Sequence, residues 1–153
     1  MIFILTAPIQ SGKTTSLISW SAKRNDVHGI LTPVVGGKRV FMNVQTKEHF
    51  PMEAKGEEET LVVGRFAFSK AGFDKAIQII RDAINKEVCL IIDEIGPLEL
   101  KGKGFCDVLK EVLEKKVQKL LLVVRDKNGM VEKVKKYFEL TSAEVIKDIS
   151  ELT

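Results

Sequence analysis

Residues 7–15, near the start of the chain, constrain the fold more than any other segment. Their sequence APIQSGKTT keeps the spacing of the phosphate-binding loop G-x-x-x-x-G-K-[ST], with Ala7 in place of the first glycine. The apolar run 2–6 precedes them, and the segment 13–24, of helical composition, follows. A strand, a turn and a helix in this order present backbone N–H groups at a helix N-terminus, where phosphate binds. The segment therefore predicts a site for the phosphates of a nucleotide.

The residue types within this loop indicate a division of roles. Lys13 is expected to reach the β- and γ-phosphates, the Thr14 hydroxyl to bind Mg²⁺, and Thr15 to contact the α-phosphate. Gly12 lets the backbone approach the ligand closely, whereas Ala7 adds a Cβ where glycine would accept a positive φ, which predicts a differently shaped loop entry and weaker binding. The predicted nucleotide-binding residues are Ala7, Pro8, Ile9, Gln10, Ser11, Gly12, Lys13, Thr14 and Thr15.

A second motif, VCLIIDEIGPLEL at residues 88–100, predicts the metal ligand and the group that activates water. Its apolar run ends in Asp93, as a Walker B strand does, and the carboxylate at such a strand end meets Mg²⁺. Glu94 follows directly and is expected to activate or orient a water for attack on the γ-phosphate. Mg²⁺ is thus the predicted cofactor, held by Thr14 and Asp93, and a nucleoside triphosphate is the predicted ligand. Each motif alone has a plainer explanation, a solvated turn or a helix-capping acidic pair, but their co-occurrence favours the nucleotide site.

Beyond these motifs, short apolar runs alternate with stretches of helical period. That rhythm is typical of an α/β protein whose parallel strands are buried on both faces. Ser69 is the expected N-cap of the second helix. The tail, residues 139–153, is compatible with a short strand plus helix or with a docked extension. The sequence predicts strands at 2–6, 88–92 and 120–124, and helices at 13–24, 69–86, 105–117 and 131–138.

The segment 28–68 has a different character, because it is rich in valine, phenylalanine and threonine. Two successive glycines, Gly36 and Gly37, indicate a hairpin within it. We therefore predict an inserted β-ribbon here. The polar stretch 47–60, with Pro51 and three consecutive glutamates, is expected to form an exposed loop.

Composition excludes several classes of protein. The 153 residues, 44% hydrophobic and 29% charged, predict one folded domain over 1–153. A net charge of +3 is too small to indicate nucleic acid or membrane as a partner, and no apolar run reaches the ~20 residues of a membrane helix. Cys89 and Cys106 are too few for a disulfide framework and lack the paired spacing of a zinc site. We expect a cytoplasmic protein that has no leader sequence and binds neither membranes nor nucleic acid. The composition does not indicate which protein, if any, is its partner.

The segments SGKTT, GILTPVVGGKRVFMNVQT, VGRF and DEIGPLEL together resemble the small nucleoside-triphosphatase family of cancer-related and thermophile-type members. The resemblance spans most of the chain. It implies a three-layer P-loop NTPase fold, RecA-like and of the additional-strand, catalytic-glutamate class, with a mainly parallel sheet and an inserted β-hairpin region. It also implies Mg²⁺-dependent hydrolysis of ATP, GTP and related nucleotides with modest base selectivity. The chain departs from the family pattern at Ala7, Ile9, Gln10, Ser11 and Leu98, which bears on rate and substrate preference.

Three arginines are candidates for stabilising charge in the transition state: Arg39, Arg65 and Arg125. Arg125 is the best of them, because residues that end a strand face the ligand crevice of an open parallel sheet. It joins Lys13 and Glu94 as a predicted catalytic residue. Glu99 is expected to support its neighbours or to pack, without contact to the ligand.

Two other functions remain open from the residues alone. In a phosphotransferase, Glu94 or Asp93 would activate an acceptor hydroxyl and the stretch 47–60 would act as a lid, although an arginine-rich lid segment is missing. A non-catalytic nucleotide-binding switch protein is favoured by Ala7 in the altered loop. A phosphorylated small molecule would indicate the first alternative, and tight nucleotide binding without turnover the second.

Overall fold

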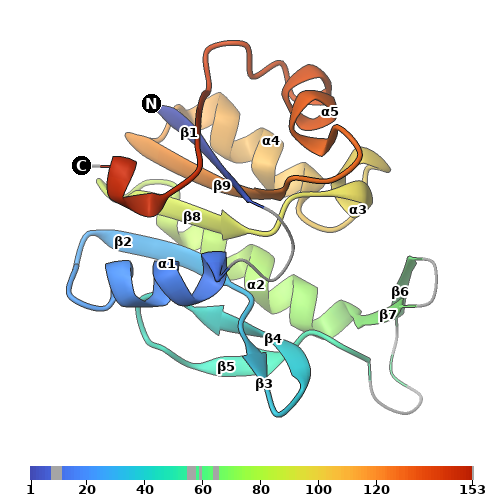
Figure 1. Cartoon of the computed structure of the whole chain (residues 1–153). Helices are drawn as coiled ribbons and strands as arrows, with labels where there is room; N and C mark the ends of the chain where they lie inside the picture. Colours follow the sequence, from blue (N-terminus) through green and yellow to red (C-terminus); the bar gives the residue numbers. More distant parts are fainter. Residues whose placement is uncertain (8–11, 55–57, 59, 64–65, 153) are drawn as a thin grey trace.

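The computed structural model describes residues 1–7, 12–54, 58, 60–63 and 66–152. Its centre is a mixed sheet with the strand order β10-β1-β9-β8-β2-β4-β3, in which β5 also pairs with β4. Every pairing among the first five strands of that order is parallel, which confirms the predicted α/β class (Figure 1). These five strands are β1 (Ile2–Ala7), β2 (Val27–Leu31), β8 (Cys89–Asp93), β9 (Lys119–Arg125) and β10 (Glu144–Ile146).

Helices cover both faces of this sheet. Successive strand residues point to opposite sides, so each central strand contributes side chains to two cores. Phe3 and Leu5 of β1 belong to the core beneath α1 (Lys13–Ser21) and the 3₁₀ turn η1 (Ile149–Glu151). Ile4, between them, belongs to the other core. That second core lies beneath three further helices, so the protein has three layers (Figure 1). The three helices are α2 (Lys70–Ala83), α4 (Cys106–Lys115) and α5 (Met130–Tyr137).

Two helices show how local sequence sets their ends. The Ser69 hydroxyl accepts a hydrogen bond of 3.0 Å from the backbone N–H of Gly72 and caps α2, as predicted. Helix α1 ends at Ser21, earlier than the predicted residue 24, because the residues that follow are exposed and no buried side chain holds another turn on the sheet.

The predicted β-ribbon is confirmed in part. The hairpin of β3 (Val34–Val35) and β4 (Lys38–Asn43) turns at the two expected glycines, which have φ of +59° and +79°. Further antiparallel pairings involve β5 (His49–Pro51), and β6 (Thr60–Val63) with β7 (Phe66–Ser69). The prediction was wrong in part for β2, which pairs antiparallel with β4 on one side but is a buried strand parallel to β8 on the other. Its sequence VHGIL is buried throughout, as in a strand covered on both faces.

The tail takes the first of its two expected forms, a short strand followed by a helical turn. Strand β10 pairs in parallel with β1, and η1 lies on the α1 face. In the part of the chain that the structure describes, every helix is too short or too polar to cross a bilayer.

Candidate active site

The two sequence motifs meet at one edge of the sheet. Ala7 ends β1 and lies opposite Arg125 of β9, while Asp93 ends β8 and lies opposite Val123. One strand, β9, separates β1 from β8, the arrangement that the additional-strand class implies. Because the carboxyl ends of parallel strands share an edge, residues far apart in sequence come together there.

Helix α1 begins at Lys13, directly after Gly12. Gly12 is the N-cap residue, with a φ of +83°, and no described residue lies within 4 Å of the position of its missing Cβ. Glycine is therefore favoured by its backbone angle. The Lys13 ammonium donates a long hydrogen bond, 3.4 Å, to the carbonyl of Ala7, while Thr15 is exposed. The other predicted loop residues, Pro8, Ile9, Gln10 and Ser11, lie outside the described residues.

Asp93 is the centre of the hydrogen-bond network that joins the motifs. Its Oδ2 accepts a hydrogen bond of 3.0 Å from the Thr14 hydroxyl and one of 3.1 Å from the backbone N–H of Thr32. The side chain is only 1% exposed, and burial raises the pKa of Asp93 while these two hydrogen bonds lower it. Its other oxygen, Oδ1, is buried and has no hydrogen-bond partner among the described residues.

These groups fit a magnesium ion. A buried carboxylate oxygen left unpaired, beside a hydroxyl, is a hard oxygen donor set of the kind that Mg²⁺ prefers. The described ranges contain no cluster of three or more histidine, cysteine, aspartate or glutamate side chains that could hold a metal by themselves. Mg²⁺ usually takes few of its ligands from the protein, and phosphate and water oxygens supply the others. Thr14 and Asp93, the two predicted ligands, are the residues that this structure brings together.

Glu94 lies beside Asp93 and is paired with Arg125. The Arg125 Nε is 3.0 Å from Oε1 and 3.1 Å from Oε2 of the Glu94 carboxylate. Burial raises the pKa of Glu94, as does the charge of Asp93, while Arg125 and Arg39 lower it. The residue predicted to activate water and the arginine preferred from the sequence are therefore in direct contact.

Of the other two candidate arginines, Arg39 lies among the described residues and Arg65 does not. Arg39, on β4, donates to the carbonyl oxygen of Thr32 at 3.2 Å and to its hydroxyl at 3.3 Å. It thereby steadies the segment whose N–H binds Asp93. Arg65 lies outside the described residues.

Sequence reasoning missed Thr32, whereas Glu99 takes the supporting position expected of it. Thr32 follows β2, and its bond to Asp93 depends on β2 and β8 being neighbours, which no local pattern indicates. Glu99 lies in the short helix α3 (Pro97–Leu100), with Oε1 accepting from Gly96 N–H at 2.8 Å and Oε2 from Phe105 N–H at 3.0 Å. It is 3% exposed, and burial raises its pKa to about 7. The available signal was a capping pattern, because Glu99 is the third helical residue after the N-cap Gly96 and follows Pro97 at the first helical position.

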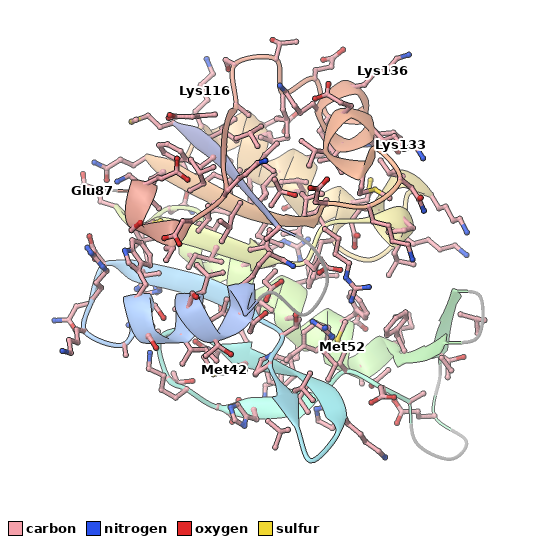
Figure 2. The ribbon with its side chains drawn as sticks, viewed as in Figure 1. Met42, Met52, Glu87, Lys116, Lys133 and Lys136 are labelled. Atoms are coloured by element: carbon pink, nitrogen blue, oxygen red, sulfur yellow. The ribbon has the colours of Figure 1, made fainter. Side chains whose placement is uncertain are left out.

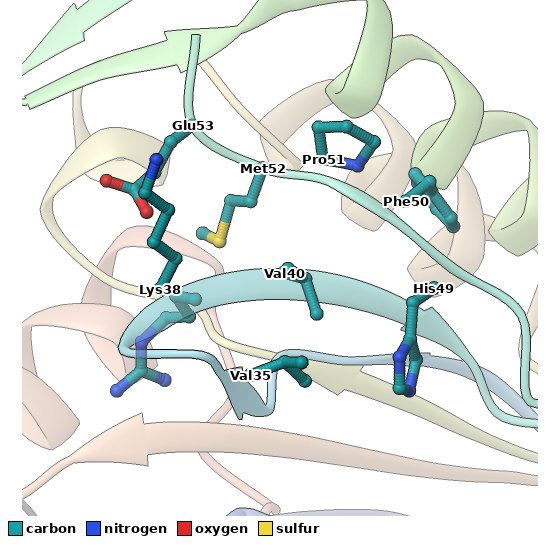
Figure 3. Close-up of a pocket in the computed structure, with 9 residues that line it drawn as sticks. Val35, Lys38, Val40, His49, Phe50, Pro51, Met52 and Glu53 are labelled. Atoms are coloured by element: carbon teal, nitrogen blue, oxygen red, sulfur yellow. The ribbon is translucent and has the colours of Figure 1, made fainter. Parts of the chain in front are cut away.

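One cavity reaches this edge of the sheet, and a second lies on the inserted hairpin. The larger, about 490 Å³, is walled by Phe68, Phe73 and Phe105 and reaches Glu94 and Arg125. The smaller, about 310 Å³, lies against β4 and β5, and Figure 3 shows its lining. Met52, labelled in Figures 2 and 3, lines both.

Comparisons with known proteins agree with this geometry. A family model described as NTPase matches residues 2–150 of the chain. The nucleoside-triphosphatase THEP1 of Methanothermobacter thermautotrophicus is 35% identical over 115 residues, which cover 72% of this chain and 64% of that protein. The protein of the same name from Methanocaldococcus jannaschii is 32% identical over 137 residues, covering 83% of this chain and 78% of that protein. The match to the first of these relatives spans less than two thirds of its length.

Solved structures share the fold. The solution structure of a human cancer-related nucleoside triphosphatase superposes with a TM-score of 0.71 at 21% identity, covering 95% of this chain and 87% of that one. The crystal structure of THEP1 from the hyperthermophile Aquifex aeolicus gives 0.69 at 23% identity, covering 96% and 89%. At these identities the likeness concerns the fold, and it confirms the three-layer architecture expected from the sequence.

Proposed function

This chain belongs to the NTPase family, and we propose that it hydrolyses nucleoside triphosphates to the diphosphate and phosphate in a Mg²⁺-dependent reaction. The observation that carries the proposal is the 3.0 Å hydrogen bond from Thr14 to Asp93. It joins the start of the phosphate-binding helix to the end of the Walker B strand, across 79 residues of sequence. Phosphate and metal sites meet in this way in P-loop nucleotide hydrolases, which supports the proposal.

The phosphates would bind at the start of α1. Helix N-termini carry unpaired N–H groups and a positive dipole, and among the described residues no side chain caps α1. Lys13 adds a positive charge at the same end, where its ammonium donates a long hydrogen bond to the carbonyl of Ala7. Thr14 and Asp93 would hold Mg²⁺, which supplies charge neutralisation at the phosphate oxygens when bound.

Glu94 would act on the attacking water. Its carboxylate accepts the proton as the water oxygen bonds to the γ-phosphorus, and the bond to the bridging oxygen breaks with its electrons left on the diphosphate. A carboxylate whose pKa is raised by burial and by Asp93 is a better proton acceptor near neutral pH than an exposed one. Arg125 holds this carboxylate in place and brings a positive charge to the same edge.

Two further properties belong to the proposal. The substrate is a nucleoside triphosphate recognised mainly through its phosphates, since the groups that carry the proposal all lie at the phosphate and metal end of the site. Both cysteines are free and buried, which supports a reducing compartment such as the cytoplasm.

The test is phosphate release from ATP and GTP with Mg²⁺ by the wild type, Lys13→Ala and Glu94→Gln. We expect Lys13→Ala to lose nucleotide binding, measured with a fluorescent triphosphate analogue. Glu94→Gln should still bind but release phosphate about 100-fold more slowly or worse, because only the proton acceptor is lost. Lys133→Ala and Glu87→Gln, exposed positions labelled in Figure 2, are the matched controls. Equal rates in all five proteins would refute the proposal.

A further inference from the structure

The cavity of about 490 Å³ begins at the residue proposed to activate water. Glu94 and Arg125 are among its lining residues, and no described residue of the phosphate-binding loop contributes to the lining. The remaining wall comes from the inserted hairpin, from α2 and from the segment around α3. The cavity thus lies next to the site of attack and apart from the described part of the phosphate-binding loop.

Its size exceeds what hydrolysis requires. A single water occupies roughly 30 Å³, and one water beside Glu94 suffices for the proposed reaction. A cavity of several hundred Å³ with a mainly apolar lining is of the kind that binds small molecules. The volume therefore indicates an organic second ligand.

The wall indicates an aromatic ligand. Phe73 meets Phe68 edge to face, with ring centroids 5.8 Å apart, and lies 5.2 Å from Phe105 at a tilt of 51°. All three rings line the cavity. Tilted rings of this kind present both edges and faces, against which a further aromatic ring packs well.

The charges in the lining favour a neutral ligand. Arg125 is paired with Glu94, and Arg39 donates to Thr32. Glu99 has both oxygens occupied by backbone N–H groups. The described lining holds two arginines and three glutamates, so it carries no excess of positive charge that would favour an anionic ligand. The Glu94 carboxylate can still accept a hydrogen bond from a hydroxyl group.

We propose that this cavity binds a neutral aromatic alcohol and presents its hydroxyl to Glu94 as a phosphoryl acceptor in place of water. The alcohol oxygen bonds to the γ-phosphorus, and the bond to the bridging oxygen breaks with its electron pair left on the nucleoside diphosphate. The hydroxyl proton passes to the Glu94 carboxylate and from there to solvent. The products are a phosphate monoester and the diphosphate. This proposal rests on the hydrolase function above, because it uses the same phosphate grip and the same proton acceptor.

The probe for a test is naphthylethanol, whose fluorescence reports binding to the full-length chain. Ethylnaphthalene, without a hydroxyl, and naphthylacetate, with a negative charge, are the matched ligands. Phe68→Ala removes one aromatic wall on the two-stranded ribbon, and Tyr137→Ala removes a half-exposed ring on α5 that is not part of the cavity lining. Binding of a triphosphate analogue to both variants confirms that each is folded.

We expect saturable binding of naphthylethanol, tighter than that of naphthylacetate. Phe68→Ala should weaken it about tenfold, whereas Tyr137→Ala should leave it unchanged. With ATP or GTP and Mg²⁺, mass spectrometry should detect naphthylethyl phosphate, and Glu94→Gln should form none while still binding the alcohol. Absence of saturable binding, equal binding by Phe68→Ala, or free phosphate as the only product would each overturn the proposal. Phosphate release measured without the probe reports separately on the hydrolase function, so the two failures are distinguishable.

Discussion

The Nε of Arg125 lies 3.0 Å from Oε1 and 3.1 Å from Oε2 of Glu94, so one guanidinium nitrogen is shared between both oxygens of the carboxylate. Arg125 ends β9 and Glu94 follows β8, and the two strands are neighbours. The pair therefore fixes the proposed proton acceptor to the rigid edge of the sheet. A partly buried carboxylate in such a pair is oriented and is kept more acidic than burial alone would make it.

Removing that arginine should change the pH dependence of turnover. In Arg125→Ala the pKa of Glu94 should rise further above 4.5, because burial and Asp93 then act without the main opposing charge. Glu94 must be ionised to accept a proton, so kcat falls as pH drops through its pKa. We expect the acidic limb of the kcat–pH profile to move to higher pH. Arg81→Ala, which breaks the exposed pair with Glu111, should leave the profile where it is.

Substitution of Thr14 should act on the magnesium requirement. Thr14→Ala removes the hydroxyl that bonds Asp93 and is proposed to bind the metal. Bonds to charged groups are worth about 1.5–3 kcal/mol, which predicts a rise of roughly 10–100-fold in the Mg²⁺ concentration for half-maximal turnover. Thr14→Ser keeps the hydroxyl and should stay close to the wild type. A titration in which Thr14→Ala and Thr14→Ser behave alike would show that the hydroxyl does not contribute.

Glu99 should make stability depend on pH. Its pKa in the folded protein is raised from 4.5 to about 7 by burial, so between these values the folded state holds a proton that the unfolded state has lost. Stability therefore falls as pH rises through this window and levels off above it. The advantage of the wild type over Glu99→Gln in the free energy of unfolding should be about 2–3 kcal/mol larger at a pH of about 5 than at about 8.

Urea unfolding of both proteins at the two pH values measures this difference. The amide of Glu99→Gln can accept only one of the two backbone N–H bonds, which costs about 1–3 kcal/mol at either pH. Glu111→Gln is the control, because Glu111 is exposed and its pKa is lowered by Arg81. Its effect should be the same at both pH values, since its carboxylate is ionised over this range.

Gly29 should tolerate no side chain. It lies in β2 with a φ of +125°, and a Cβ there would overlap the backbone of Ile91 on the neighbouring strand. Gly37 also has a positive φ, +79°, but open space surrounds it. Gly37→Ala should cost about 1 kcal/mol of stability from backbone strain. Gly29→Ala should cost about 3 kcal/mol or more, because strand β2 must move away from β8. Equal unfolding temperatures for the two variants would contradict the overlap.

Much of the architecture could be predicted because its signals are local. The cap at Ser69, the apolar strand that ends in Asp93, and the turn at Gly36 are set by neighbouring residues in the chain. The error at β2 had a physical cause. A short apolar run next to hairpin sequence is compatible with either a ribbon or a central strand, and only its neighbours in the sheet decide between them.

The amino-acid order alone predicted a turn suited to phosphate, a carboxylate-tipped strand and the alternation of strands with helices, because backbone preference and burial pattern act over a few residues. Tertiary structure selected the contacts between distant segments: Thr14 with Asp93, Thr32 with Asp93, and Glu94 with Arg125. It also placed three phenylalanines from separate elements around one cavity. Such contacts depend on strand order and on how the two apolar faces pack, and those are properties of the whole sheet that no short segment carries.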